Sequence, residues 1–382
     1  MSGGATGAAT DPVVERHKPR WVPVLRRLLV AVAVAVPTLL VLAFVVSAEV
    51  RYLLRAGYEE SRILLKRRPI ADLVSDSATP AELRQRLQLV LAARAFAGDS
   101  LHLAVGETFT TYVNVGRDTL LLVLSAGRRD KLLEHTWHYP IVGSVPYKGF
   151  FDTRQARRAA ADLEAAGYDV YLRPAGAFST LGYFSDPLLS TVVGRDTMEL
   201  VATVLHELAH NTLYVKSQTS FNESFASFVG YRGAQRFFRA RGDPRDAARA
   251  AARWRDEQLL DVFWAELARV LDSAYAGNLS GEALERARAR VFGWARAQLT
   301  GAVGQQLETY DWRGFARAPL NNAVAIAQRF YRSNLNLFEE VYVQNNADLA
   351  ETVRAIQIRV LTQPGLDPFR ALYSRPGIPA RD

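Results

Sequence analysis

The residues with the clearest chemical potential are His206, Glu207 and His210, which form a His-Glu-x-x-His motif. Two histidines four positions apart share one face of an α-helix and can converge on a single cation. The glutamate between them stands where its carboxylate can polarise a metal-bound water, the arrangement used in zinc-dependent hydrolysis. The motif predicts a zinc site with Glu207 as the catalytic base. The alternative is a pair of ordinary surface histidines beside an unrelated glutamate.

A zinc site of this kind needs a third protein ligand. The longer His-Glu-x-x-His-x-x-Gly-x-x-His form is broken by Leu213 and Lys216, and no histidine follows His210. A downstream ligand must therefore be a carboxylate, and Glu223 is the nearest downstream acid. A helix–turn–helix can fold Glu223 back over the histidines. The competing interpretation is that Glu223 completes a capping box with Ser220.

Several further residues stay open as participants in the site. The fallback metal ligands are the upstream histidines His102, His135 and His138. A tyrosine is the natural second donor to an oxyanion, with a plain packing role as the alternative. The candidates are Tyr183, Tyr310 and Tyr331. Residues 178–188 either pair with an extended peptide or form a loop over the core.

The histidine motif requires a helix, and the sequence predicts one over residues 196–215. Asp196 can cap its N-terminus, Glu199 occupies the capping-box position, and the residues between are largely apolar. The remaining C-terminal part predicts further helices separated by Gly, Pro and Asn residues. Their ranges are 220–241, 244–274, 280–303, 319–343 and 346–360.

The preceding part of the chain is mixed in character. A capping box at Thr79 and Glu82 predicts a helix start, and a further helix is expected at 153–167. β-prone runs lie at 109–115, 119–124 and 168–173. The predicted fold is therefore α+β and predominantly α-helical. A small mixed sheet would pack on a helical, zincin-like catalytic core, preceded by one N-terminal transmembrane helix.

The run Leu28–Ala48 is long enough to cross a bilayer. It contains no charged residue and, at about 1.5 Å per residue, spans about one hydrocarbon core. Val46-Ser47-Ala48 also fits a signal-peptide cleavage site, but the length of the run favours an uncleaved anchor. The flanking positive charges do not set its orientation, and the short N-terminal tail favours a domain outside the cytoplasm.

The composition bounds the other possibilities. The 382 residues contain no cysteine, which excludes disulfides, a thiol nucleophile and cysteine-bound zinc. The net charge of +8 comes mainly from arginines scattered among acidic residues, so we expect a solvated surface and no nucleic-acid partner. The expected organisation is a disordered tail (1–27), the membrane segment (28–48), an α+β part (49–195), a helical zinc-site part (196–365) and a C-terminal tail (366–382).

The motif followed by Asn222-Glu223-x-x-Ala226 resembles the gluzincin metallopeptidases, in which a second helix brings the glutamate ligand. More closely, roughly residues 50–360 resemble a bacterial family of predicted aminopeptidases. The stretches that carry this resemblance are 139–152, 178–188, the two metal-site segments and Asn321-Asn322-Ala323. The chain lacks the lipobox cysteine typical of many members and has an apolar helix in its place. It also lacks the Gly-x-Met-Glu-Asn element that grips a substrate amino group in the wider group.

Together with the apolar run, the resemblance implies a single-pass protein of the bacterial inner membrane with a periplasmic catalytic domain. It would bind Zn²⁺ through His206, His210 and Glu223, act on a peptide substrate and hydrolyse the peptide bond through a metal-activated water, in the manner of an aminopeptidase. Two alternatives remain. One is a zinc hydrolase of another amide or ester, and the other is a membrane-tethered interaction protein with a vestigial metal site.

Overall fold

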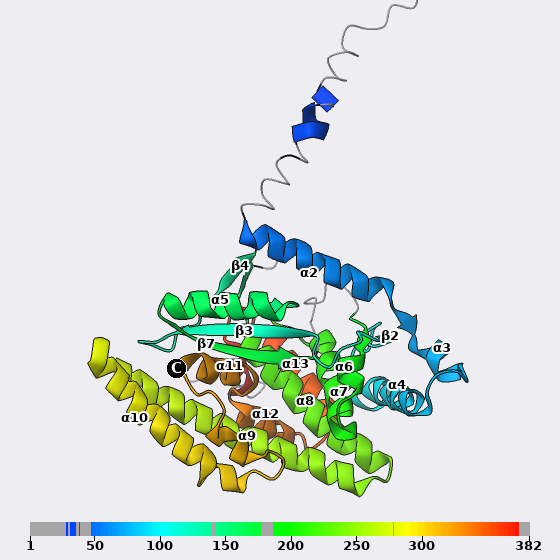
Figure 1. Cartoon of the computed structure of the whole chain (residues 1–382). Coiled ribbons are helices and arrows are strands. Elements are labelled where there is room, and N and C mark those ends of the chain that lie inside the picture. The colour runs from blue at the N-terminus through cyan, green and yellow to red at the C-terminus, as the bar shows by residue number, and fades with distance from the viewer. Residues whose placement is uncertain are drawn as a thin grey trace, which may run out of the picture. The chain divides into compact units, whose positions relative to one another are not determined.

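The structure is a computed structural model that describes residues 28–29, 31–35, 38, 47–139, 143–176, 186–277 and 279–373. The chain divides into a first unit that ends at Glu59 and a larger second unit that begins at Glu60. The first unit includes most of helix α2 (Ala48–Leu65). The second unit holds every strand of the described residues and the predicted metal ligands (Figure 1).

The predicted membrane segment, Leu28–Ala48, lies largely outside the described residues. Its described residues at 28–29, 31–35 and 38 are helical. Among the helices that the structure describes, none combines the length and the apolar character needed to cross a membrane. The anchor therefore stays a prediction, as does the division of the chain into domains.

The strands of the described residues form three small sheets. The central sheet has the strand order β6 (Tyr147–Phe150), β3 (Leu121–Arg128), β7 (Tyr168–Ala175). A second sheet has the order β1 (Arg68–Pro69), β2 (Thr111–Val113), β8 (Leu188–Leu189), and the third pairs β4 (Trp137–Tyr139) with β5 (Gly143–Val145). The first sheet is antiparallel, whereas β2 and β8 run parallel. The β1-β2-β8 sheet is mixed, because β1 pairs antiparallel with β2, so the expected small mixed sheet is present beside two antiparallel sheets.

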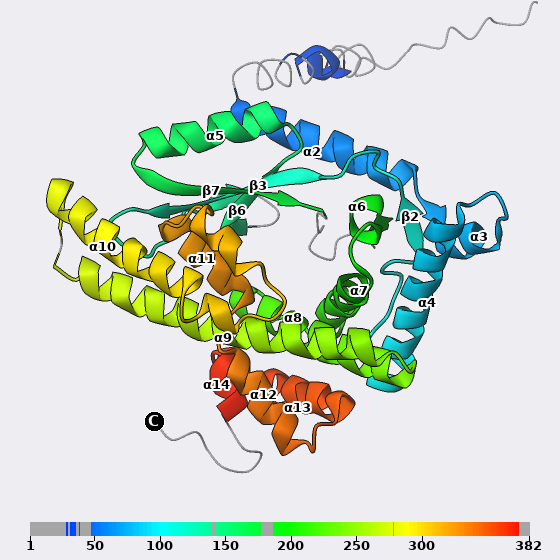
Figure 2. The same cartoon turned by 60° about the horizontal axis from the view of Figure 1, so that its bottom comes forward.

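Helices cover both faces of the β6-β3-β7 sheet. Helix α5 (Thr153–Ala165) lies on one face and α11 (Asn322–Tyr331) on the other (Figures 1 and 2). Strand β3 is buried along nearly its whole length, which explains its continuous apolar run. Helix α11 can approach β3 closely because Gly127 has no side chain, and a Cβ there would lie 2.7 Å from Ile326 Cδ1.

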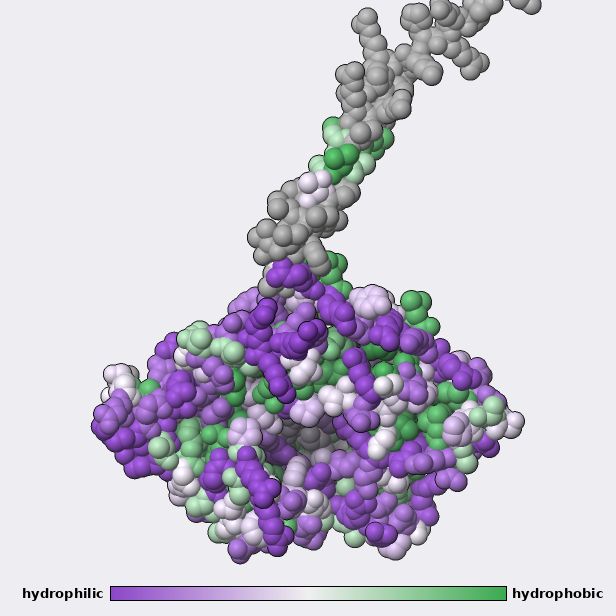
Figure 3. Space-filling model, viewed as in Figure 1, coloured by the Kyte–Doolittle hydropathy of each residue, from purple (hydrophilic) through white to green (hydrophobic). Residues whose placement is uncertain are grey.

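The rest of the second unit is helical, which confirms the predominantly helical fold. The predicted metal ligands lie on α7 (Thr197–Thr212) and α8 (Thr219–Ala240). Besides α5, the helices of the unit before this pair are α3 (Ile70–Ser75), α4 (Ala81–Leu101) and α6 (Ser190–Val193). Besides α11, the helices after it are α9 (Pro244–Tyr275), α10 (Gly281–Thr300), α12 (Leu335–Gln344), α13 (Leu349–Leu361) and α14 (Pro368–Tyr373). Hydrophilic residues dominate the face in Figure 3, as expected if the arginines lie on solvated helix faces.

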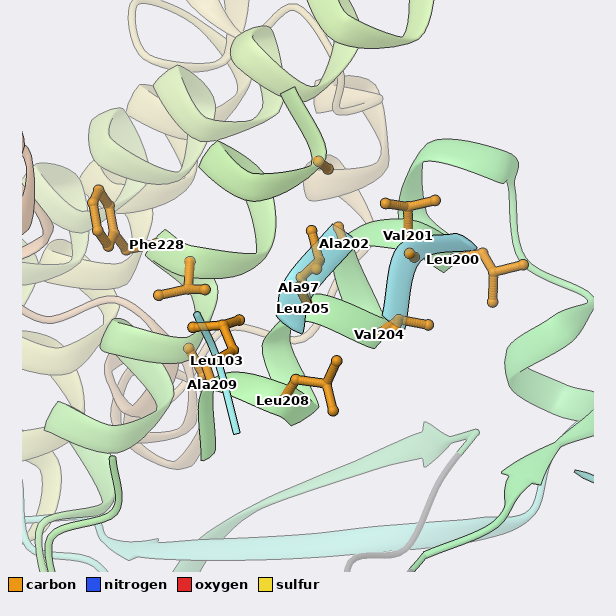
Figure 4. Close-up of a cluster of buried hydrophobic side chains, with 14 of the residues drawn as sticks. Ala97, Leu103, Leu200, Val201, Ala202, Val204, Leu205, Leu208, Ala209 and Phe228 are labelled. Atoms are coloured by element: carbon orange, nitrogen blue, oxygen red, sulfur yellow. The ribbon is translucent and has the colours of Figure 1, made fainter. Parts of the chain in front are cut away.

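Helix α7 is anchored at its start and along its apolar face. Asp196 caps it as predicted and accepts hydrogen bonds from the backbone N–H groups of Met198 and Glu199, at 3.1 and 3.4 Å. Its apolar side chains pack against α4 and α8 (Figure 4). The side chains labelled there include Leu200, Val201, Val204, Leu205 and Leu208 of α7, Ala97 of α4 and Phe228 of α8. The helix that carries the histidines is thus fixed by the core.

Two local sequence signals gave wrong predictions. Thr79 is not the N-cap, because α4 begins one residue later, after Pro80, without a side-chain cap. The single helix expected over 319–343 is broken into α11 and α12, with Asn334 in the left-handed region at φ 54°. Tertiary hydrogen bonds stabilise this break, since Ser333 N donates to the Ser224 hydroxyl and Leu335 N to the Asp261 carboxylate.

The described part of the expected C-terminal tail is also ordered. Residues 366–373 include α14, where Ala371 and Leu372 are buried. The ring of Phe369 packs against Phe221 and Phe338, with centroids 5.3 and 6.1 Å away. Apolar contacts with the core therefore hold a segment that carries no strong local helix signal.

A buried polar cluster ties α10 and α11 to the central sheet. Asp169 of β7 accepts hydrogen bonds from Arg288 Nη2 at 2.6 and 2.9 Å and from Asn322 N at 2.9 Å. The Asn322 side chain accepts from the Tyr275 hydroxyl and donates to the Arg128 carbonyl. Asn321 caps α11 and donates to the Val170 carbonyl. The Asn-Asn-Ala segment therefore fastens α11 to the sheet.

Replacement of Asp169 by asparagine is expected to lower the free energy of unfolding by about 3–5 kcal/mol, because it removes the buried counter-charge of Arg288 and leaves only the exposed Glu285 carboxylate at 3.7 Å. Urea denaturation measures this change. The matched control is Asp130→Asn in the exposed Arg128–Asp130 pair, which should change stability very little. Equal losses in the two variants would contradict the proposed importance of the buried pair.

Candidate metal centre

The two histidines of the motif converge as their spacing predicts. Both lie on α7, with ring centroids 4.8 Å apart and Nε2 atoms 3.2 Å apart. The Glu223 carboxylate of α8 reaches the same point. Its Oε2 lies 3.4 Å from His206 Nε2, and its Oε1 lies 3.7 Å from His210 Nε2.

The spacing of the two imidazole nitrogens and the carboxylate oxygens suits one metal ion. With zinc–ligand bonds of about 2.0–2.1 Å, neighbouring corners of a tetrahedron stand about 3.3–3.4 Å apart. Two imidazole nitrogens and one carboxylate oxygen are also a common donor set for a divalent transition metal. The side chains of His206, His210 and Glu223 are each about one fifth exposed (19, 20 and 21%), so a ligand from solvent can reach the fourth corner.

A side-chain clamp shapes the connection between α7 and α8. The amide of Asn222 binds both backbone groups of Val215, accepting from its N–H and donating to its carbonyl, each at 2.8 Å. Ser217 takes a positive φ of 63° in the same turn. Helix α8 begins at Thr219 after Gln218, with no side-chain cap. Glu223 is therefore not the capping residue of α8, and it faces the histidines.

Small residues on α8 allow the two helices to pack closely. Ala226, Gly230 and Gly233 fall on the same side of α8 as Glu223 by helical spacing. A Cβ at Gly230 would lie 2.8 Å from the Ala202 carbonyl oxygen and 3.3 Å from His206 Cβ. The absence of this side chain lets α8 approach α7 directly beside the metal ligands.

The charges in the cluster stabilise a histidine–carboxylate pair. Burial alone would lower the pKa of His206, but the hydrogen bond and negative charge of Glu223 outweigh it and raise that pKa. Burial likewise opposes ionisation of Glu223, yet the hydrogen bond from His206 and the charges of both histidines hold the pKa of Glu223 below its usual value. Burial and the neighbouring His206 lower the pKa of His210 to about 4.

Glu207 stands beside the cluster and outside the donor set. Burial raises the pKa of its carboxyl, and the negative charges of Glu223 and Asp186 raise it further, against the attraction of His206. A carboxylate whose proton affinity is raised by its surroundings suits proton transfer near neutral pH. Its neighbour Asp186 lies just before β8, a proximity that the sequence alone did not indicate.

Three tyrosines and one arginine surround the cluster. Burial raises the pKa of Tyr331 to about 12, and the charge of Glu223 adds to the effect. Burial also raises the pKa of Tyr147, which is close enough to respond to Tyr331 and Glu223. Tyr214 stacks edge-on near His210 with ring centroids 6.4 Å apart. Arg173 forms a hydrogen bond with Tyr331 and acts electrostatically on Glu223.

The sequence identified only Tyr331 among these four residues. Tyr147 belongs to one of the stretches quoted for the family resemblance, but no local signal gave it a role. Arg173 reaches the site only through the fold. Tyr214 stands four residues after His210, so its helical spacing was a signal that could have identified it.

The remaining candidates lie elsewhere or outside the described residues. Tyr310 donates a hydrogen bond to Glu257 and lies under Arg253 at 4.0 Å from ring centroid to guanidinium carbon, so it is a packing residue. Among the described residues, the cluster that could hold a metal ion contains none of the fallback histidines. Tyr183 and most of 178–188 lie outside the described residues.

The fold and the site together define a mostly helical protein with small sheets and a possible His-His-Glu metal site. The chain belongs to a family described as "putative aminopeptidase", whose model matches residues 51–363. The match includes both metal-site helices and the central sheet, and family membership suggests a peptidase. No curated protein and no solved structure matches the chain.

Replacement of Gly230 by alanine is expected to separate α7 from α8, because the new Cβ would meet the Ala202 backbone oxygen at 2.8 Å. Overpacking of this kind costs about 1–3 kcal/mol. The variant should melt at lower temperature and bind metal more weakly, as measured by thermal unfolding and metal titration.

Gly233→Ala is the matched control for this prediction. Its Cβ would meet the flexible end of the Leu205 side chain at 2.8 Å, not backbone, and alanine favours the helix by about 1 kcal/mol over glycine. It should lose less stability and keep its metal affinity. If the two variants bind metal equally, Gly230 does not position the cluster.

Proposed function

We propose that the protein is a zinc-dependent peptidase with a zincin-like helical core, in which His206, His210 and Glu223 hold the metal. The observation that carries the proposal is the convergence of three side chains. The Nε2 atoms of His206 and His210 lie 3.2 Å apart, and the two Glu223 carboxylate oxygens approach them to 3.4 and 3.7 Å, with the separate carboxylate of Glu207 nearby. Membership of the aminopeptidase family supports a peptide bond as the target. When bound, zinc supplies Lewis-acid activation of water and of the substrate carbonyl.

Glu207 is proposed to move the proton. Its carboxylate accepts a proton from the attacking water and then delivers it to the nitrogen of the leaving amine. Burial, which raises the pKa of this carboxyl, makes it a better base for the first step and keeps the proton available for the second. Because Glu207 is not one of the three donors, it can do this while the histidines and Glu223 keep their positions.

Tyr331 is proposed to stabilise the oxyanion that forms on the substrate. Burial raises the pKa of its phenol to about 12, so the hydroxyl stays protonated at neutral pH and can donate a hydrogen bond. A fixed donor aimed at developing charge is worth about 2.7–4 kcal/mol in catalysis where such donors have been removed. Tyr331 is a better candidate than Tyr310, whose hydroxyl is already bound to Glu257.

The Glu207→Gln variant of the full-length protein should bind about one zinc, melt close to the wild type and hydrolyse peptides about 10²–10⁴-fold more slowly. The reason is that glutamine preserves shape and helix propensity but cannot take a proton. Elemental analysis, thermal melting and a peptide-library assay measure the three properties. Loss of zinc from this variant would mean that Glu207 coordinates the metal.

Two comparisons complete the experiment. His210→Ala should lose zinc and activity together, since it removes a donor. Glu340→Gln on the exposed side of α12 removes the same charge away from the site and should keep both. A zinc-loaded wild type that cleaves no peptide would favour a different hydrolase or a binding protein.

The apolar run at residues 28–48 is proposed to anchor the protein in the bacterial inner membrane, with the catalytic unit in the periplasm. The protein should stay in the membrane fraction after carbonate extraction. Protease added to the outside of spheroplasts should digest the residues beyond 50. Two arginines in the run, Val34→Arg and Leu39→Arg, cost about 2.5–3.5 kcal/mol each in a bilayer and should release it. Protection from protease in spheroplasts would reverse the orientation.

A further inference from the structure

Arg173 lies on the face of the central sheet that looks towards α11. In the register, Val123 of β3 pairs with Arg173 of β7, and Ser125 pairs with Tyr147 of β6. Residues two apart along a strand point to the same face, so Tyr147 and Arg173 project from opposite edges of the sheet to the same side. Asp169 lies four residues before Arg173 on β7 and therefore points to the same face. It accepts a hydrogen bond from Asn322, the first residue of α11, so this face is the one that α11 covers.

Tyr331 fixes the direction of the Arg173 side chain. The guanidinium carbon lies 5.8 Å from the centre of the Tyr331 ring, and the two side chains share a hydrogen bond. Tyr331 in turn responds to the charges of both Glu223 and Glu207, so it lies near the reacting groups as well as near Arg173. The positive charge of Arg173 therefore stands at the border of the metal site.

The guanidinium of Arg173 differs from four guanidiniums inside the helical part of the unit. These four are satisfied by carboxylates, in the pairs Arg232–Glu339, Arg253–Glu199, Arg288–Asp169 and Arg332–Glu257. Among the described residues, no carboxylate forms an ion pair with Arg173. Glu223, the acid on which it acts, is committed to the two histidines. Arg173 is thus a half-buried cation that contacts Tyr331 and, with five N–H groups in its guanidinium, has donors beyond the one bonded to Tyr331.

We propose that Arg173 binds a carboxylate of the substrate, so that the preferred substrates are short peptides whose free C-terminal carboxylate lies next to the bond that is cleaved. This inference rests on the peptidase function proposed above. The guanidinium fork matches a carboxylate in a two-bond geometry, and partial burial strengthens that contact. Because Arg173 contacts Tyr331 and acts electrostatically on Glu223, a carboxylate that it binds would lie near the reacting groups, which favours cleavage next to the C-terminal residue.

Equilibrium binding to the zinc-loaded, full-length Glu207→Gln protein tests the inference without turnover. The probes are alanyl-alanine and its C-terminal amide, compared by calorimetry. The free carboxylate should bind about 10- to 100-fold more tightly than the amide, the range for hydrogen bonds to a charged group. In the double variant Glu207→Gln with Arg173→Gln, the preference for the free carboxylate over the amide should disappear. The double variant with Arg173→Lys should keep part of this preference.

Arg158→Gln is the matched control, because it removes the same charge from exposed α5, which covers the opposite face of the sheet. It should leave the preference intact. Zinc content and melting temperature of every variant establish that the site is folded. Unchanged preference in a folded, zinc-loaded Arg173→Gln protein would overturn the proposal, as would equal weakening of both probes.

Hydrolysis by the wild type separates this inference from the function on which it rests. Cleavage of free and amidated peptides at equal rates would support the peptidase function and contradict the carboxylate site. A carboxylate preference in binding that depends on Arg173, without cleavage of any peptide, would support the carboxylate site and contradict the peptidase function.

Discussion

The close packing of α7 on α8 is the constraint on which the rest of the site depends. The histidines lie on α7 and the carboxylate on α8, so the metal cluster exists only if the two helices almost touch. Gly230 permits this contact beside His206, and Asn222 closes the turn that joins the helices. The opposite side of α8 carries Phe221, Phe225 and Phe228, which pack on Phe338 of α12. Helix α8 is therefore packed on both sides, and this packing fixes the backbone position of Glu223 relative to the histidines.

Buried charged groups are arranged differently inside and outside the metal site. Outside the site, several buried or half-buried arginines and acids form matched pairs that join helices to one another and to the sheet, as in Arg288 with Asp169. Around the metal cluster, burial instead leaves groups whose proton affinity is displaced, above all Glu207 and His210. Burying such groups without full compensation costs stability. The extensive core formed around α4, α7 and α8 offsets that cost and keeps the groups fixed.

Local signals predicted most of the fold, and they failed where distant contacts were stronger. The helix over α7 was correct because its cap, Asp196, and its apolar face are both encoded within one segment. The break between α11 and α12 was missed because its backbone groups bind Ser224 and Asp261, which are far away in sequence. The ordered α14 was missed for the same reason, since Phe369 gains its place from Phe221 and Phe338.

The sequence by itself determined the core of the candidate site. Two histidines four residues apart share a helix face through backbone geometry alone, and a short turn limits where Glu223 can lie. Only the tertiary structure decided which groups surround them. Tyr147 and Arg173 meet near the metal cluster because β6 and β7 pair with the same strand, and Tyr331 joins them because α11 packs on that sheet. Strand register and helix packing depend on contacts between distant segments, so no local pattern in the sequence could reveal this set.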